Sequence, residues 1–345
     1  MKALVIGLAA SLAVATGAHA AGIKQVKDWI GVCANTGACT AVGFGAEEDA
    51  TGAYLMIERS AGPAAQPKAT LVFDAAEATP AADWILTIDD HPVAGLGSVH
   101  ANGSEAGARA ELTGRAAAAL IAALRAGDQL AFAPPGKDGG DVSLAGSAAV
   151  LLWIDDQQGR VGTVTALARP GPKPAASVPP AIPPPLIAPA PAVDQKGVPG
   201  HAPRSMIKGI GDCDLDPAVK DPDDIVARLA SGLLLWGPQC TMGAYNEGNV
   251  FFLGNERGGS LRRVDFPEPP GASAKSDDLL INAEFDPKTQ SMSMRDKARG
   301  IGDCGELTTW VWDGGAFRVT RELSMPACRG MLPEDWPVLF ASRQK

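Results

Sequence analysis

The sequence predicts a mainly β protein with some α structure, built from two domains that a proline-rich linker joins and that disulfides staple. Short apolar runs rich in β-branched and aromatic residues recur along its 345 residues, which is the pattern of strands. Only two segments have a helical pattern. Twelve of the 28 prolines lie between residues 170 and 203, a density that excludes a helix or a central strand there. The length suits two domains of about 150 residues each.

The composition indicates a folded, acidic protein. Hydrophobic residues make up 46% and charged residues 20% of the chain, and 30 Lys and Arg stand against 39 Asp and Glu, for a net charge of −9. This is enough apolar material for real cores. The acidity argues against nucleic acid or an anionic membrane as the main partner.

Residues 1–20 have the pattern of a signal peptide. Lys2 precedes an apolar run over residues 3–15, and residues 18–20 read Ala-His-Ala, a small-x-small cleavage pattern. A buried N-terminal helix is the alternative. No other apolar stretch approaches the 18 residues of a membrane span. We therefore expect a mature chain that begins near Ala21, is periplasmic or secreted, and does not span a membrane.

The six cysteines predict three disulfides, because an even number in an exported chain indicates oxidised pairs. Six thiols allow 15 pairings, so the pairing is a hypothesis. Zinc is the alternative, but the chain has no CxxC pair and only four histidines. Residues 30–32 and 40–42 resemble the strands of a hairpin whose neck would bring its two cysteines within bonding range. Pairing each cysteine with its neighbour gives Cys33–Cys39, Cys213–Cys240 and Cys304–Cys328.

The N-terminal domain, residues 21–169, is expected to be a small sheet with two helices. A helix over residues 114–126 would begin after Thr113 as N-cap and stop at Gly127, and a second would cover residues 147–156 and end by Gly159. The expected strands lie at residues 54–57, 70–73, 84–88 and 129–132.

Residues 170–203 form the linker. Its prolines favour extended polyproline II, which at about 3.1 Å per residue could hold two bodies up to roughly 100 Å apart. The alternative is an ordered segment that wraps around a domain surface.

The C-terminal domain, residues 204–345, is expected to be rich in strands. Asp313-Gly314-Gly315 predicts a hairpin turn between two of them. Residues 208–213 and 299–304 share the pattern Gly-Ile-Gly-Asp-Cys, which fits either a duplicated disulfide loop or a coincidence. The expected strands lie at residues 233–236, 250–253, 279–282, 310–312 and 317–320.

Several of these segments resemble an uncharacterised secreted proteobacterial family, domain of unknown function 1176. The segments are Lys27-Asp28-Trp29 with Cys33 and Cys39, residues 143–167, Gly243-Ala244-Tyr245-Asn246, residues 299–305, residues 310–314 and Cys328-Arg329-Gly330. The resemblance covers both domains and implies no activity. The N-terminal half is also similar, more faintly, to invasion-associated locus B proteins, secreted envelope proteins linked to host-cell entry.

Three motifs imitate ligand sites without their structural context. Residues 300–305 match G-x-G-x-x-G, but strand-like residues follow where the dinucleotide fold needs a helix, so a tight turn is favoured. Residues 205–208 match the S-x-x-K of penicillin-recognising enzymes but lack intact companion motifs. Asp212, Asp214 and Asp216 imitate a calcium loop, with Asp223 at its twelfth position and Pro217 where the EF-hand needs Gly. We predict no cofactor and no metal.

Two acidic groups are candidates for catalysis. Asp155 and Asp156 would point about 100° apart on a helix, so a structural role is favoured, with Asp156 paired to Arg160. Asp89, Asp90 and His91 could serve a hydrolase, although nothing marks a nucleophile. No catalytic residue is therefore assigned.

The aromatic residues of the C-terminal domain provide the binding hypothesis. Trp310 and Trp312 would face the same side of a strand. Core packing is the default; the alternative is an exposed platform for an envelope protein or glycan. The platform would consist of Tyr245, Asn246, Trp310, Trp312, Asp313 and Arg329.

These observations favour a non-catalytic binding or interaction module of the cell envelope, with two heads that the proline-rich spacer holds apart. The alternatives are an envelope hydrolase with an unrecognised site in the N-terminal domain, or a disulfide-rich enzyme inhibitor.

Overall fold

A computed structural model describes residues 21–46, 52–74, 79–105, 107–136, 139–208, 210, 213, 215–216, 219–269 and 279–345. The predicted signal peptide lies outside these residues, as do Asp212 and Asp214 of the calcium-like motif. Within them, 25 strands accompany two α-helices, so the prediction of a mainly β protein is confirmed. No helix in the described part is long and apolar enough to cross a bilayer.

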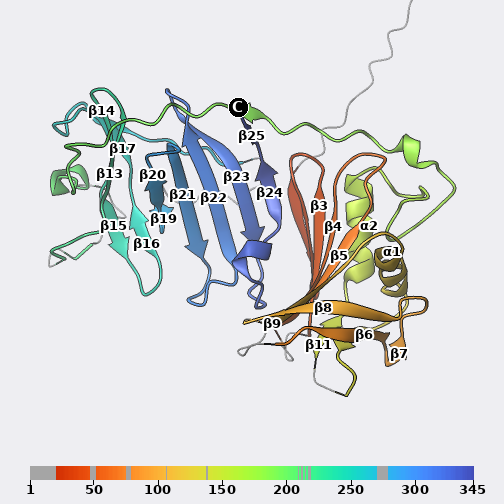
Figure 1. The fold of residues 1–345 in the computed structure, drawn as a ribbon. Helices are drawn as coiled ribbons and strands as arrows, with labels where there is room; N and C mark the ends of the chain where they lie inside the picture. The colour runs from red at the N-terminus through yellow and green to blue at the C-terminus, as the bar shows by residue number, and fades with distance from the viewer. Residues whose placement is uncertain are drawn as a thin grey trace, which may run out of the picture.

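Residues 21–169, here called the N-terminal half, form one antiparallel sheet in the order β1-β2-β3-β4-β5-β9-β8-β6-β10-β11, with β7 paired to β6. The last strand, β11, packs back against β3 and β4, so the sheet curls around its own core (Figure 1). The strands are β1 (Gly22–Val26), β2 (Trp29–Cys33), β3 (Cys39–Phe44), β4 (Ala53–Arg59), β5 (Lys68–Asp74), β6 (Ala82–Ile88), β7 (His91–Pro92), β8 (Ser98–Ser104), β9 (Gly107–Leu112), β10 (Gln129–Ala133) and β11 (Gly140–Ser143).

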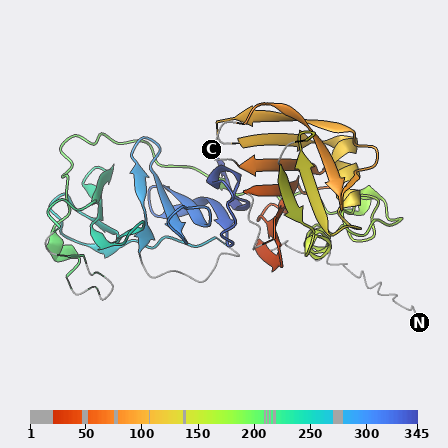
Figure 2. The same cartoon turned by 90° about the horizontal axis from the view of Figure 1, so that it is seen from below.

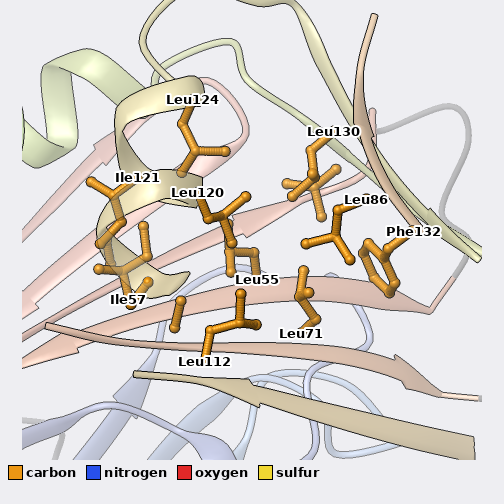
Figure 3. Packing of buried hydrophobic residues seen from close by; sticks show 14 of the residues in the cluster. Leu55, Ile57, Leu71, Leu86, Leu112, Leu120, Ile121, Leu124, Leu130 and Phe132 are labelled. Carbon is orange, nitrogen blue, oxygen red and sulfur yellow. The ribbon is translucent and has the colours of Figure 1, made fainter. Parts of the chain in front are cut away.

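Two helices cover this sheet where the sequence predicts them. Helix α2 (Ser147–Gln157) packs on β1, β2 and β3. Helix α1 (Gly114–Ala123) ends three residues earlier than expected. Its Leu120 and Ile121 point into the interior, where apolar residues of the strands meet them (Figure 3). Removing this surface from water is the main stabilisation of the N-terminal half.

Residues 204–345, the C-terminal half, contain three antiparallel sheets, with the orders β13-β14-β17-β18, β15-β16-β19 and β20-β21-β22-β23-β24. The strands are β13 (Ile225–Ala230), β14 (Leu233–Gly237), β15 (Gln239–Met242), β16 (Glu247–Asn249), β17 (Phe252–Gly254), β18 (Arg262–Arg263), β19 (Leu280–Ile281), β20 (Glu284–Asp286), β21 (Ser291–Lys297), β22 (Gly305–Trp312), β23 (Phe317–Met325) and β24 (Val338–Ala341). The predicted hairpin at residues 313–315 joins β22 and β23.

The core of the C-terminal half lies between its four-stranded and five-stranded sheets. Leu235 and Leu253 of the first pack with Trp310 and Phe317 of the second. Phe266 joins them from a connecting segment, with its ring centroid 5.3 Å from that of Trp310 and 4.8 Å from that of Phe317.

The two halves pack against each other, which corrects the prediction of separated heads. Ile30 and Val42 of the first sheet share a buried cluster with Met325, Trp336 and Leu339. Figure 2 shows the blue strands of the C-terminal half beside the red and orange strands of the N-terminal half. Because β2 is buried on both faces, its outer face needs this cover.

The proline-rich segment is an ordered strap along both halves, as the alternative interpretation has it. Ile182 N donates to Thr36 O (3.4 Å) in the N-terminal half, and Ala190 N donates to Trp312 O (2.7 Å) in the C-terminal half. Between these contacts, β12 (Leu186–Ile187) pairs in parallel with β25 (Arg343–Gln344) (Figure 1, green trace). Proline lacks the backbone N–H that a sheet ladder needs, but a proline-rich segment can still bond along the edge of a strand. The segment therefore lies on the surfaces of the two halves and does not cross open solvent between them.

Three disulfides close the chain: Cys33–Cys39, Cys213–Cys240 and Cys304–Cys328. These are the predicted pairs. Cys33 and Cys39 face each other at the neck of the β2–β3 hairpin, with Cα atoms 4.1 Å apart.

Candidate functional site: an acidic cleft

A cleft of about 620 Å³ opens in the C-terminal half where three segments meet. One segment leads into β13, the second is β16, and the third joins β19 to β20. The lining residues are Asp223, Asp224, Ile225, Val226, Glu247, Asn249, Asn282, Ala283, Glu284 and Phe285.

The wall on the β16 side is held by the amide of Asn282. Its Oδ1 accepts the backbone N–H of Glu247 (3.0 Å), and its Nδ2 donates to Asn246 Oδ1 (2.7 Å) and to Arg295 O (2.8 Å). Asn282 has a φ of +45°, a left-handed conformation that asparagine tolerates better than most residues. Glu247 and Asn249 lie two positions apart on one strand and therefore share a face.

The opposite wall depends on Asp224, whose side chain is fully buried. Its carboxylate accepts the backbone N–H groups of Ala202 (2.9 Å) and Gln239 (2.8 Å) and is paired with Arg204. Asp224 is thus a compensated structural group. Its neighbour Asp223 is fixed through its backbone, since Gln239 Oε1 accepts its N–H (2.9 Å).

The cleft carries uncompensated negative charge. Asp223, Glu247 and Glu284 line it, and none of its described lining residues is basic. Burial raises the pKa of Glu247, and the charge of Asp223 and a hydrogen bond to it raise that pKa further. Close like charges resist full ionisation, so the neighbourhood of Asp223 favours the protonated form of Glu247. The arrangement can attract a cation or donate a proton.

The structure corrects the alternative of an exposed aromatic platform. Trp310 is 1% exposed and Trp312 is 2% exposed, and the indole N–H of Trp310 donates to Pro267 O (2.8 Å). They lie on the inner face of β22, against the four-stranded sheet. Core packing, the default expectation, is therefore correct for both.

The other four platform residues are dispersed. Tyr245 is 43% exposed at the turn between β15 and β16, while Asn246 donates inward to Lys297 O (2.9 Å). Asp313 closes the β22–β23 turn by accepting two backbone N–H groups. Arg329 lies between the halves, bonded to Asp28 (3.2 Å). The six residues do not form one surface.

The catalytic candidates of the N-terminal half, Asp89, Asp90 and His91, form a turn and make contacts that hold it. Asp89 caps backbone N–H groups of Asp128 and Gln129, and an exposed His91 lies beside Asp89 O (2.6 Å). Asp89 and Asp90 both adopt positive φ, 47° and 64°, as a tight turn requires.

Of the acidic pair on α2, Asp155 is structural, whereas Asp156 is exposed. Asp155 is fully buried, pairs with Arg59 (2.8 Å) and accepts the N–H of Leu167 (2.9 Å). The predicted partner of Asp156 bonds elsewhere, because Arg160 donates to Thr165 Oγ1 (2.7 Å) and to Gly62 O.

The motifs that imitate ligand sites form turns and other structural elements. Residues 300–305 form a glycine turn, with a φ of 70° at Gly302 and 132° at Gly305, and strand β22 follows it. Ser205 lies in a short 3-10 helix, Arg204–Met206, at the end of the strap. Among the described residues, metal-type ligands gather at Asp303, Cys304 and Cys328, but the two sulfurs form a disulfide.

Sequence reasoning missed the acidic cleft. The sequence marks Asp223 only as part of a calcium-like motif, and no motif includes Glu247 or Glu284. Their positions are separated by a disulfide-bonded strand and several turns, and no spacing rule joins them. The one local signal is the pair Asp223-Asp224, two adjacent acidic residues directly before strand β13.

Comparison with known proteins gives a family but no activity. The family model "Protein of unknown function (DUF1176)" matches residues 23–343, so the chain belongs to that family. An Escherichia coli (strain K12) relative, "Uncharacterized protein YpfG", is 32% identical over an alignment of 219 residues, and the match covers 59% of this chain and 60% of the relative. The match thus spans less than two thirds of that relative's length. No solved structure matches, and the resemblance to invasion-associated locus B proteins is not shown.

Proposed function

We propose that this protein is an exported, non-catalytic binding module of the cell envelope and that its acidic cleft binds a ligand with a positively charged amine or guanidine. The observation that carries the proposal is the lining of the cleft, which has four acidic side chains, of which Asp224 is paired with Arg204, and no basic side chain among its described residues. Export is supported by the signal-peptide pattern of residues 1–20.

The cleft favours an organic cation with polar and apolar parts. Asp223 and Glu247 would accept N–H groups of the ligand in charge-assisted hydrogen bonds. Phe285 and Ile225 add apolar contact. Because the cleft is open to solvent, the affinity is expected to fall as ionic strength rises.

Titration calorimetry with spermidine tests the proposal. Oxidised protein of residues 21–345 should bind it saturably at low salt, while triethylene glycol, a neutral probe of similar length, should not bind. The double variant Asp223→Asn with Glu247→Gln should lose about tenfold or more in affinity. The control is Glu105→Gln, an exposed charge in the N-terminal half. Absence of binding, or equal binding by the double variant, contradicts the proposal.

Hydrolysis at the same cleft is the second candidate. The raised pKa of Glu247 beside the carboxylate of Asp223 is the arrangement of a general acid next to a general base. Turnover of an envelope polymer by the pure protein, abolished by Glu247→Gln with the fold intact, would favour this function over simple binding.

A further inference from the structure

A second pocket, of about 240 Å³, lies in the N-terminal half beside α1 and is separate from the acidic cleft. Helix α1, the segment before β5 and the loop after α2 enclose it. Its lining residues are Ala65, Gln66, Pro67, Ala118, Ile121, Ala122, Arg125, Val164, Thr165, Ala166, Leu167 and Pro170.

Small side chains on α1 leave this space open. Ala118 and Ala122 lie four positions apart on one exposed face of the helix, while Leu120 packs into the core. Positions four apart are neighbours on a helix surface. Ile121, 3% exposed, gives the pocket a buried apolar floor.

The opposite wall is rigid. The backbone N–H of Leu167 bonds to the buried carboxylate of Asp155 (2.9 Å), and Thr165 O accepts from Arg59 Nη1 (2.8 Å). Arg160 Nη1 bonds to the Thr165 hydroxyl (2.7 Å). A pocket held in this way is formed before a ligand arrives, which lowers the cost of binding.

The lining combines apolar surface with a single charge. Nine of the twelve lining residues are Ala, Pro, Val, Leu or Ile. Among them, Val164 is 60% exposed at the rim. Arg125 is the one charged residue of the lining, and no described carboxylate forms an ion pair with it. The C-terminus of α1 contributes about half a negative charge there, which the full charge of Arg125 exceeds.

We propose that this pocket binds a monocarboxylate with a short, unbranched apolar tail. The carboxylate would pair with the guanidinium of Arg125, and the tail would lie between Ala118, Ala122 and Leu167. The volume holds roughly eight water-sized groups, which matches a chain of about six to eight carbons. This site is independent of the acidic cleft, which selects the opposite charge.

Octanoate is the probe that tests the site, with titration calorimetry on the full chain. Octanoate should bind saturably, octanol about tenfold or more weakly, and octylamine not measurably. Arg125→Gln should reduce octanoate affinity to that of octanol. The matched control is Arg115→Gln, an exposed arginine of the same helix outside the pocket, which should bind like the wild type.

A filling variant makes the test independent of charge. Ala118→Trp should block binding of both octanoate and octanol, and because Ala118 is exposed the circular dichroism spectrum should be unchanged. Equal affinity for octanoate and octanol, unaltered binding by the filled variant, or absence of octanoate binding would each overturn the proposal.

Discussion

Tyr54 and Asp335 lie 281 positions apart in the sequence, and the phenol of Tyr54 donates a hydrogen bond of 2.6 Å to the carboxylate of Asp335. Tyr54 is fully buried, and Arg109 pairs with the same carboxylate. Burial is the largest cause that raises the pKa of Tyr54, followed by Asp335. The carboxylate of Asp335 thus joins three distant parts of the chain through two polar contacts at the interface of the two halves.

Removal of this hydroxyl should loosen the interface. Tyr54→Phe leaves a buried carboxylate oxygen without one of its donors, which costs about 1–3 kcal/mol of unfolding free energy. Urea unfolding followed by tryptophan fluorescence measures it. The control is Tyr245→Phe, at an exposed tyrosine, and an equal loss in both variants would contradict the role of the Asp335 contact.

Glu322 should make stability depend on pH. It is fully buried on β23, and neither carboxyl oxygen has a hydrogen-bond partner in the described structure. Burial first, then Glu306 and Glu268, raises its pKa from the ordinary 4.5 to about 8. The folded state therefore holds a proton that the unfolded state releases, so this contribution to stability is complete below pH 4.5 and is lost as the pH rises to about 8.

The variant Glu322→Gln tests this effect. It should remove the pH dependence and be more stable than the wild type above pH 8, by at most about 5 kcal/mol at 1.36 kcal/mol per pKa unit. Thermal unfolding at pH 5, 7 and 9 measures it, with Glu105→Gln as the control. A wild type whose stability rises between pH 5 and 9 relative to Glu322→Gln would refute the assignment.

The disulfides should differ in their contribution. Cys304–Cys328 closes a separation of 24 residues and Cys33–Cys39 one of 6. Loop-closure entropy gives about 3.5 kcal/mol for the first and about 2.4 kcal/mol for the second. Replacing Cys304 and Cys328 with serine should thus destabilise the chain by about 1 kcal/mol more than the same change at the short loop, as denaturant midpoints would reveal. The opposite order would contradict an entropic account.

The strap and the shared cluster predict a compact particle in solution. A compact chain of this length has a radius of gyration of about 20 Å, and two touching halves raise it only modestly. Two bodies separated by the full extended length of the strap would give roughly 50 Å. Small-angle X-ray scattering of residues 21–345 distinguishes the two, and the larger value would refute the packed arrangement.

Local patterns in the sequence predicted much of the fold. Cys33 and Cys39 at a hairpin neck, the two helices and the β22–β23 turn all depend on residues close in the chain. The strands predicted at residues 250–253 and 279–282 are shorter in the structure, where β17 is Phe252–Gly254 and β19 is Leu280–Ile281.

Long-range relationships were the part that local patterns could not supply. The acidic cleft joins Asp223, Glu247 and Glu284, which no period connects. The interface of the halves did have a signal: Trp29–Cys33 is apolar at every position, and a strand buried on both faces needs a second covering layer. Proline content excluded regular structure in the strap but carried no information about the surfaces that it contacts.

The pairing of β12 with β25 imposes an order on biogenesis. Leu186 and Ile187 are made long before Arg343 and Gln344, the residues with which they pair. During synthesis Ile182 can meet Thr36 and Ala190 can meet Trp312 before the end of the chain is made, but β12 has no partner strand until residues 343–344 emerge. The pairing of β12 is therefore the last of these contacts to form, and a chain interrupted upstream of residues 343–344 would leave the middle of the strap without its partner strand.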